Sequence, residues 1–127
     1  MHPKQFESII ALSGEERYEH FIARVSDWEE VWSLKNQQGF VSFGDSEENK
    51  GIPFWPHPDY ASALATGEWS DCQPQRIELE TLLSRWLPGM KKDGVLAAIF
   101  PTPRGKGIMV DPEELGSDIW KECEQYE

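Results

Sequence analysis

The N-terminal third of the chain alternates apolar and polar residues with the period of a helix. Residues 3–12 carry Phe6, Ile9 and Ile10 on one side, which predicts a short helix. Ser13 and Glu16 then fit a capping box, in which a serine and a glutamate three residues later satisfy each other's end amides. A second helix follows, with Glu15, Glu19 and Arg24 expected to face water. Its apolar stripe is formed by Tyr18, Phe21, Ile22, Val25 and Trp28.

Short apolar segments between turn residues predict a small sheet. The expected strands are residues 31–35, 40–43, 52–55, 76–79, 95–100 and 108–110. The segment 95–100 is continuously apolar, which favours a central strand covered on both faces. Pro53 cannot donate to a central ladder, so residues 52–55 are expected at a sheet edge. The polar stretches 44–51 and 68–75 are expected to be loops.

Three more helices are predicted from their end signals. One covers 58–66, with Pro58 in its first turn and Gly67 just past its end. The next covers 79–87 and is expected to stop at Pro88-Gly89. The last begins after Asp111, which serves as its N-cap. The pattern predicts one α+β domain over residues 1–127, with a small, mostly antiparallel sheet against which the helices pack.

The segment 51–65 is braced by prolines and rich in aromatic residues. Its prolines fix the backbone and push the preceding residues toward extended geometry, and Trp55–Pro56 is a candidate for a cis bond, which about 5% of such bonds adopt. One interpretation is a rigid binding surface, formed by Trp55, His57, Asp59 and Tyr60. The favoured interpretation is structural: Trp55 fills the core, and His57 or Asp59 caps the helix that follows.

The charge is strongly negative, since 23 acidic residues outnumber 12 basic ones for a net charge of −11. Phosphate backbones would repel such a surface, so nucleic acid is not an expected partner. The last helix carries Glu113, Glu114 and Asp118, which we interpret as an acidic face for a basic protein. The basic run Arg104-Gly105-Lys106-Gly107 lacks a phosphate-loop pattern and leads into a strand, so a basic hairpin turn is favoured.

Few residues suggest catalysis or metal binding. His20 follows Glu16 by four positions, but no second histidine lies at ligand spacing, so no metal or cofactor is expected. No serine lies in a nucleophile-elbow context, and Asp71 beside Cys72 opposes a reactive thiolate. Both cysteines are expected to be free thiols. The chain shows neither a signal-peptide pattern nor a membrane-length apolar run, which indicates a cytoplasmic protein.

Several stretches resemble one bacterial family, domain of unknown function 2750. They are RYEHFIARVSDWEEVWSL (17–34), GIPFWPHPDYA (51–61), IELETLL (77–83), AIFPTP (98–103) and MVDPEEL (109–115). The runs at 55–61 and 100–102 are the most specific. The resemblance implies a small cytoplasmic bacterial protein, usually of one domain, and provides no catalytic residues to transfer. In size, acidity and Trp/Pro content the chain is also similar to several immunity proteins that neutralise bacterial toxins.

These observations favour a non-catalytic protein-binding module, immunity-like in character, over an enzyme. Its acidic face would meet a basic partner, and the segment 54–60 would be the rigid anchor. The alternative is a small-molecule-binding protein or minor enzyme, with a pocket near His57, Tyr60 and Arg104. A third interpretation is a protein that works through self-association, and the sequence leaves the oligomeric state open.

Overall fold

The N-terminal helices form where the hydrophobic pattern predicts them. The computed structural model describes residues 2–42, 50–103 and 107–124, and begins with α1 (Pro3–Ile10) and α2 (Gly14–Trp28). The capping box at the start of α2 is confirmed: the Glu16 amide donates to Ser13 Oγ at 3.2 Å, and the Ser13 amide donates to Glu16 Oε1 at 3.3 Å. These bonds satisfy amide groups that an uncapped helix end would leave exposed.

The first sheet has the strand order β2-β1-β4, with β1 at its centre. The strands β1 (Glu30–Asn36) and β2 (Gly39–Phe40) form the predicted hairpin, and β4 (Gln73–Glu78) pairs antiparallel to β1 over its full length. Residues 73–75, which were expected to lie in a loop, therefore belong to β4. Only Ile77 is buried in β4, so this strand shows no alternation of apolar and polar residues that could reveal it.

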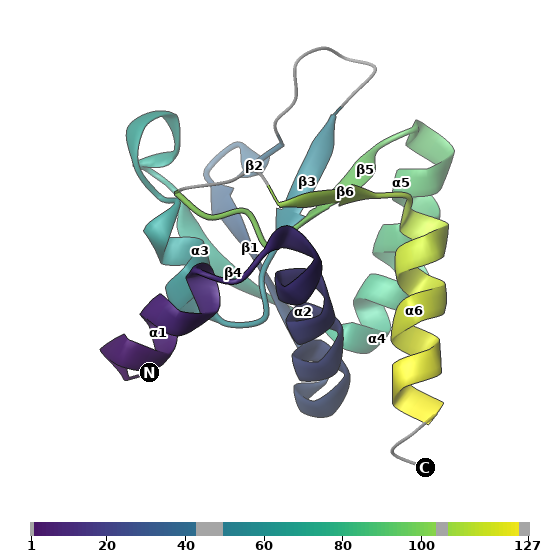
Figure 1. The fold of residues 1–127 in the computed structure, drawn as a ribbon. Helices are drawn as coiled ribbons and strands as arrows, with labels where there is room; N and C mark the ends of the chain where they lie inside the picture. The colour runs from purple at the N-terminus through teal and green to yellow at the C-terminus, as the bar shows by residue number, and fades with distance from the viewer. Residues whose placement is uncertain (1, 43–49, 104–106, 125–127) are drawn as a thin grey trace.

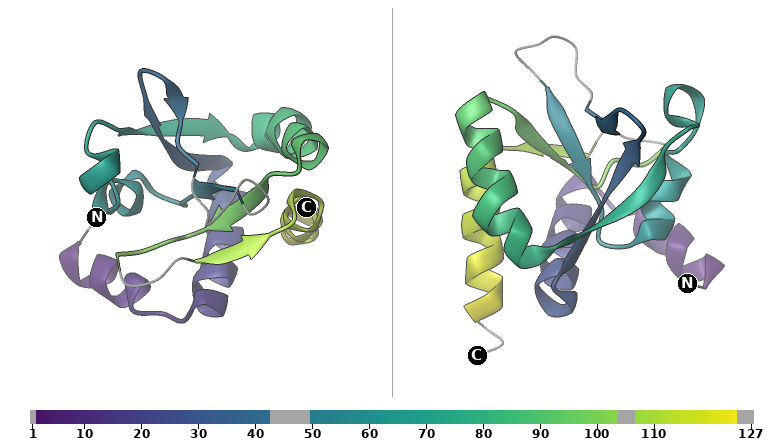
Figure 2. Two further views of the ribbon diagram at one scale, coloured as in Figure 1. Left: turned by 90° about the horizontal axis from the view of Figure 1, so that it is seen from above. Right: turned by 180° about the vertical axis from the view of Figure 1, so that it is seen from behind.

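The second sheet has the order β3-β5-β6. The apolar strand β5 (Leu96–Ile99) is central, as predicted, and β6 (Ile108–Val110) pairs antiparallel to it. The edge strand β3 (Gly51–Phe54) is parallel to β5. There are thus two small sheets where one was expected. They meet at Trp32 and Trp55, whose amides donate to each other's carbonyls at 2.9 and 2.8 Å, and Figure 2 shows the two sheets from above.

The helix after the proline-braced segment is shorter than predicted. Helix α3 (Pro58–Ala63) has Pro58 in its first turn. Leu64 caps it, well before Gly67, which begins the separate 3-10 turn η2 (Gly67–Trp69). The described residues contain no cis peptide bond, so Trp55–Pro56 is trans.

The predicted helix stop at Pro88 is wrong. Helix α4 (Leu79–Thr81), the π-helical turn η3 (Leu82–Trp86) and α5 (Leu87–Asp93) follow one another without a break, and Gly94 ends the run at φ 72°. In η3 the Leu87 amide donates to the carbonyl of Leu82, five residues back. A proline lacks an amide hydrogen and crowds the carbonyl four residues before it, so a wider π turn just ahead of Pro88 lets the helix continue.

Helix α6 (Pro112–Glu124) begins at its predicted cap, since the Glu113 amide donates to Asp111 Oδ1 at 2.9 Å. It buries Leu115 and Ile119 and packs against both α2 and α5. Figures 1 and 2 show α5 and α6 side by side at one end of the molecule, with α1 and α3 at the other. The result is one compact α+β domain, as predicted. Within the described ranges, no helix has both the length and the apolar content that a membrane crossing requires.

Candidate functional site

Trp55 is part of the core. Its side chain is 0% exposed, and its indole Nε1 donates to the carbonyl of Pro101 at 2.8 Å. Its backbone joins the two sheets through Trp32. Trp55 therefore fills the core, as the structural interpretation predicts, and its indole has no exposed surface to which a ligand could bind.

His57 caps α3, as the structural interpretation predicts. The Asp59 amide donates to His57 Nδ1 at 3.1 Å. A ring nitrogen that accepts a hydrogen bond carries no proton, so the hydrogen of the neutral ring is on Nε2. The Asp59 carboxylate lies 3.8 Å from Nδ1 and is partly exposed. His57 is thus held in one orientation, with its Nε2–H directed away from the cap.

Tyr60 is enclosed by other rings. It is 2% exposed, and its ring centroid lies 4.6 Å from Phe100, 5.3 Å from Phe6 and 6.1 Å from His57. Burial, opposed by nearby Arg24 and assisted by Asp59, raises the pKa of Tyr60 to about 12. The hydroxyl therefore stays protonated at neutral pH.

Three residues of α2 lie beside these two, and the sequence analysis did not group them with His57 and Tyr60. The Arg24 guanidinium is 5.2 Å from the Trp28 ring, and that ring lies edge-on to His57 with 6.4 Å between centroids. His20 faces Phe100 at 6.3 Å and does not pair with Glu16, which serves the capping box. We call His20, Arg24, Trp28, His57 and Tyr60 the α2–α3 cluster. The spacing of 20, 24 and 28 along one helix face was the available signal.

Arg104, the remaining predicted binding residue, lies outside the described residues, as do Gly105 and Lys106. Its place beside His57 and Tyr60 stays a prediction.

The predicted acidic face divides into two parts. Glu113 and Glu114 are exposed, and Glu113 lies 3.6 Å from Lys91, which also pairs with Asp111 at 3.1 Å. Asp118 is half-buried and accepts a 2.5 Å hydrogen bond from the Tyr18 hydroxyl of α2. The first two therefore lie on the surface, with Glu113 in an exposed pair with Lys91, while Asp118 holds α6 against α2.

The same helix exposes a tryptophan that the sequence argument overlooked. Trp120 is 59% exposed, and helical spacing places it on the side of α6 that carries Glu113 and Glu124. Between α5 and α6 lies a groove of about 200 Å³. The groove is lined by Leu83, Leu87, Pro88, Lys91 and Glu113. A Cβ built on Gly116 would lie 3.5 Å from Leu87 Cδ1, so α6 approaches α5 closely here.

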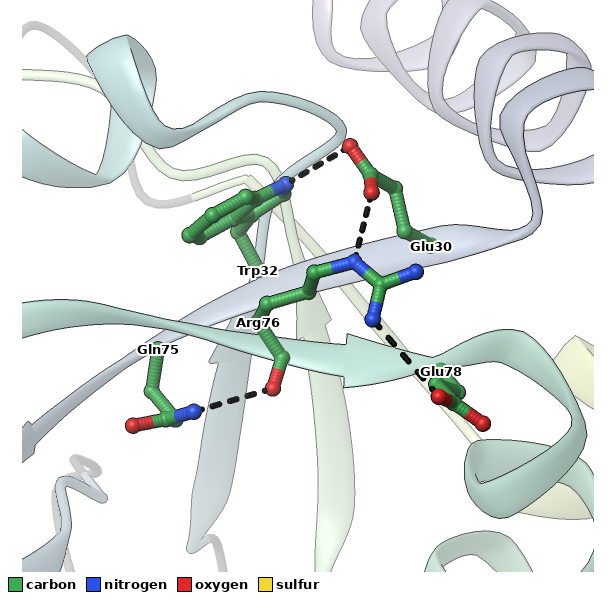
Figure 3. A network of polar contacts seen from close by, with 5 residues as sticks. All are labelled: Glu30, Trp32, Gln75, Arg76 and Glu78. Carbon is green, nitrogen blue, oxygen red and sulfur yellow. Dashed lines mark hydrogen bonds and ion pairs between the residues drawn. The ribbon is translucent and has the colours of Figure 1, made fainter.

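A third polar cluster lies on the outer face of the first sheet. Arg76 Nε donates to Glu30 at 2.7 Å, and its Nη1 lies 3.7 Å from Glu78 (Figure 3). Trp32 Nε1 also donates to Glu30, at 3.4 Å. The cluster has one positive and two negative charges, and exposed pairs of this kind contribute little to stability. We interpret it as support for the β1–β4 pairing.

The thiols and metal-type residues form no site in the described ranges. Cys72 is buried, and burial together with a 3.6 Å hydrogen bond to Asp71 raises the pKa of its thiol. Such a thiol stays protonated and reacts slowly. The described residues contain no group of three or more His, Cys, Asp or Glu placed to hold a metal ion.

Comparisons with known proteins give one match. Residues 18–119 match the model of a family described as Protein of unknown function (DUF2750). Searches of curated proteins and of solved structures returned no match. The matched region includes most of α2, all the described strands and most of α6. Because it covers well over half of the 127 residues, the chain belongs to the DUF2750 family.

Proposed function

We propose that this protein is a non-catalytic, cytoplasmic protein-binding module, immunity-like in character, that docks a basic partner on the α5–α6 face. We define this face as Trp120, the α5–α6 groove and the exposed acids Glu113, Glu114 and Glu124. The observation that carries the proposal is Trp120, a large aromatic residue 59% exposed on an acidic helix. Tryptophan is among the residues that most often anchor protein interfaces.

Trp120 replaces the anchor that the sequence suggested. Trp55 and Tyr60 of the segment 54–60 are buried, at 0% and 2% exposed. Covering the exposed part of an indole contributes about 2 kcal/mol, or about thirtyfold in affinity. The proposed anchor, Trp120, and the acidic residues thus lie on one helix. The sequence had instead suggested an anchor at residues 54–60 and an acidic face on the last helix.

The charge around Trp120 defines the partner. The chain from 111 to 124 contains acids at 111, 113, 114, 118, 122 and 124, and Lys121 is its one base. The groove beside it has Leu83 and Leu87 in its lining. A matching segment would carry lysines or arginines toward α6 and an apolar side chain toward the groove, because complementary charge speeds encounter and fixes the register.

The test uses a defined probe, a labelled Lys/Leu amphipathic peptide, with a Glu/Leu peptide of the same pattern as its counterpart. Fluorescence anisotropy measures binding at 50 and 300 mM salt. We expect only the basic peptide to bind and to weaken at the higher salt. Trp120→Ala should lower its affinity about thirtyfold, and Glu113→Lys with Glu114→Lys at least tenfold. Asp118 is left unchanged because its substitution would disturb the α2–α6 contact.

The matched control is Trp28→Ala, which removes the other strongly exposed tryptophan among the described residues, 44% exposed on α2. It should leave peptide binding unchanged. Equal losses from Trp28→Ala and Trp120→Ala would show nonspecific attraction to the acidic protein and would overturn the proposal. Light scattering of the free protein separates self-association through Trp120, since a dimer would dissociate in the Trp120→Ala variant.

A further inference from the structure

We propose that the α2–α3 cluster is a binding site for a small organic carboxylate, with Arg24 as its charged contact. The site is separate from the α5–α6 face and uses none of its residues. The cluster brings a guanidinium, two imidazoles, a phenol and an exposed indole together from α2 and α3. These groups are mainly hydrogen-bond donors, which suits an anionic ligand.

Arg24 is held by an aromatic ring, whereas two other bases are held by carboxylates. Arg76 pairs with Glu30 and Glu78, and Lys91 pairs with Asp111 and Glu113. Arg24 rests on the Trp28 ring, and within the described ranges it has no carboxylate at ion-pair distance. In a chain with 23 acidic residues, a guanidinium without a carboxylate is available for an external one.

The neighbouring groups can add directed hydrogen bonds. The cap on α3 leaves the hydrogen of neutral His57 on Nε2, where it can be donated. Tyr60 is buried behind His57 and supports its ring, and burial together with Arg24 lowers the pKa of His20. Arg24 is therefore the member of the cluster that is always positively charged. The face of Trp28 holds the guanidinium by a cation–π contact and offers a flat surface to an organic ligand.

The charge of Asp59 limits which anion fits. Its carboxylate lies 3.8 Å from His57 Nδ1. A ligand with two negative charges would be repelled more strongly than one with a single charge, which favours a monocarboxylate over a phosphate dianion. The proposal therefore commits to a monocarboxylate with a flat apolar part, for which benzoate is the simplest probe.

The experiment titrates the folded protein with sodium benzoate and follows side-chain and backbone amide shifts by NMR. We expect saturable shifts at Arg24, Trp28 and His57. Arg24→Met should weaken binding at least tenfold, and Arg24→Lys should recover only part of it because lysine lacks the guanidinium fork. Sodium chloride and inorganic phosphate at matched ionic strength should give no saturable shift.

Two controls keep the result interpretable. Arg85→Met removes an exposed arginine on η3, outside the cluster, and should leave benzoate binding unchanged. Trp120→Ala should also leave it unchanged, so failure here is distinct from failure of the partner-docking proposal. Benzoate shifts that survive Arg24→Met, or that phosphate reproduces at the same residues, would overturn the assignment.

Discussion

Alanine substitutions at Gly107 and Gly94 together test how closely the backbone of Ile99 approaches Gly107 in the second sheet. Both glycines have positive φ, 77° and 72°, so both disfavour an L side chain. A Cβ at Gly94 would meet nothing within 4 Å, whereas a Cβ at Gly107 would lie 2.4 Å from the Ile99 carbonyl oxygen and 2.9 Å from the Pro101 nitrogen. The two sites therefore share the backbone conformation and differ in space.

The magnitudes follow from that difference. A left-handed alanine costs about 1–2 kcal/mol, and replacing glycine returns about 0.4–1 kcal/mol by restricting the unfolded chain, so Gly94→Ala should lose about 1 kcal/mol. At Gly107 the added methyl must also displace the backbone of β5, which pairs Ile99 with Ile108 beside it. Overpacking of this kind adds about 1–3 kcal/mol, for a total near 3 kcal/mol.

Urea unfolding followed by circular dichroism measures both losses. With a slope of about 1.5 kcal/mol/M, Gly107→Ala should lower the midpoint by about 2 M and Gly94→Ala by less than 1 M. Asparagine tolerates positive φ but carries a Cβ, so Gly94→Asn should be nearly neutral and Gly107→Asn should not. Equal midpoints for the two alanine variants would refute the close approach of Gly107 to Ile99.

Three further predictions concern the core and the helix ends. Arg17→Met removes the hydrogen bonds that the buried guanidinium donates to the carbonyls of Phe100 (3.1 Å) and Leu12 (2.6 Å). It should lower the free energy of unfolding by about 3 kcal/mol, since hydrogen bonds to charged groups contribute about 1.5–3 kcal/mol each. A loss below 1 kcal/mol in urea unfolding would contradict this. Ser13→Ala should cost about 1 kcal/mol by the same measurement through loss of the α2 cap, and no change would show that the cap is dispensable. The pKa of Tyr60 is about 12 against an ordinary 10, so its contribution to stability should be constant below pH 10 and be lost as the pH rises toward 12. Burial also raises the pKa of Tyr18, so Tyr60→Phe should reduce the fall and remove the phenolate absorbance that titrates near pH 12, and an unchanged profile would count against it.

The sequence correctly predicted the elements that depend on a few neighbouring residues. The capping box at Ser13, the apolar central strand and the Asp111 cap each depend on a few adjacent residues, and the structure confirms them. The second half of strand β4 falls in the predicted strand 76–79, but residues 73–75 were missed because the partner strand decides their structure: β4 pairs with β1 along its whole length while burying one side chain, Ile77. No pattern within its own six residues contains that information.

The same limit applies to the candidate sites. The prolines around Trp55 correctly indicated a stiff segment, but stiffness does not distinguish an exposed ring from a buried one, and Trp55 is buried. Trp28 belonged to the predicted apolar stripe of its helix and Trp120 to no predicted stripe, yet both are exposed. Pro88 shows the reverse case, since a π turn formed by the preceding residues removes the break that proline usually imposes.

The pairing of Trp32 with Trp55 has a consequence for how this chain comes apart. Along the chain, β1 and β2 belong to the first sheet, β3 to the second, β4 to the first again, and β5 and β6 to the second. Strands of the two sheets thus alternate along the chain, and two backbone hydrogen bonds between Trp32 and Trp55 join the sheets. No single cut yields a fragment that keeps both layers, so loss of either sheet should release the other in one cooperative step.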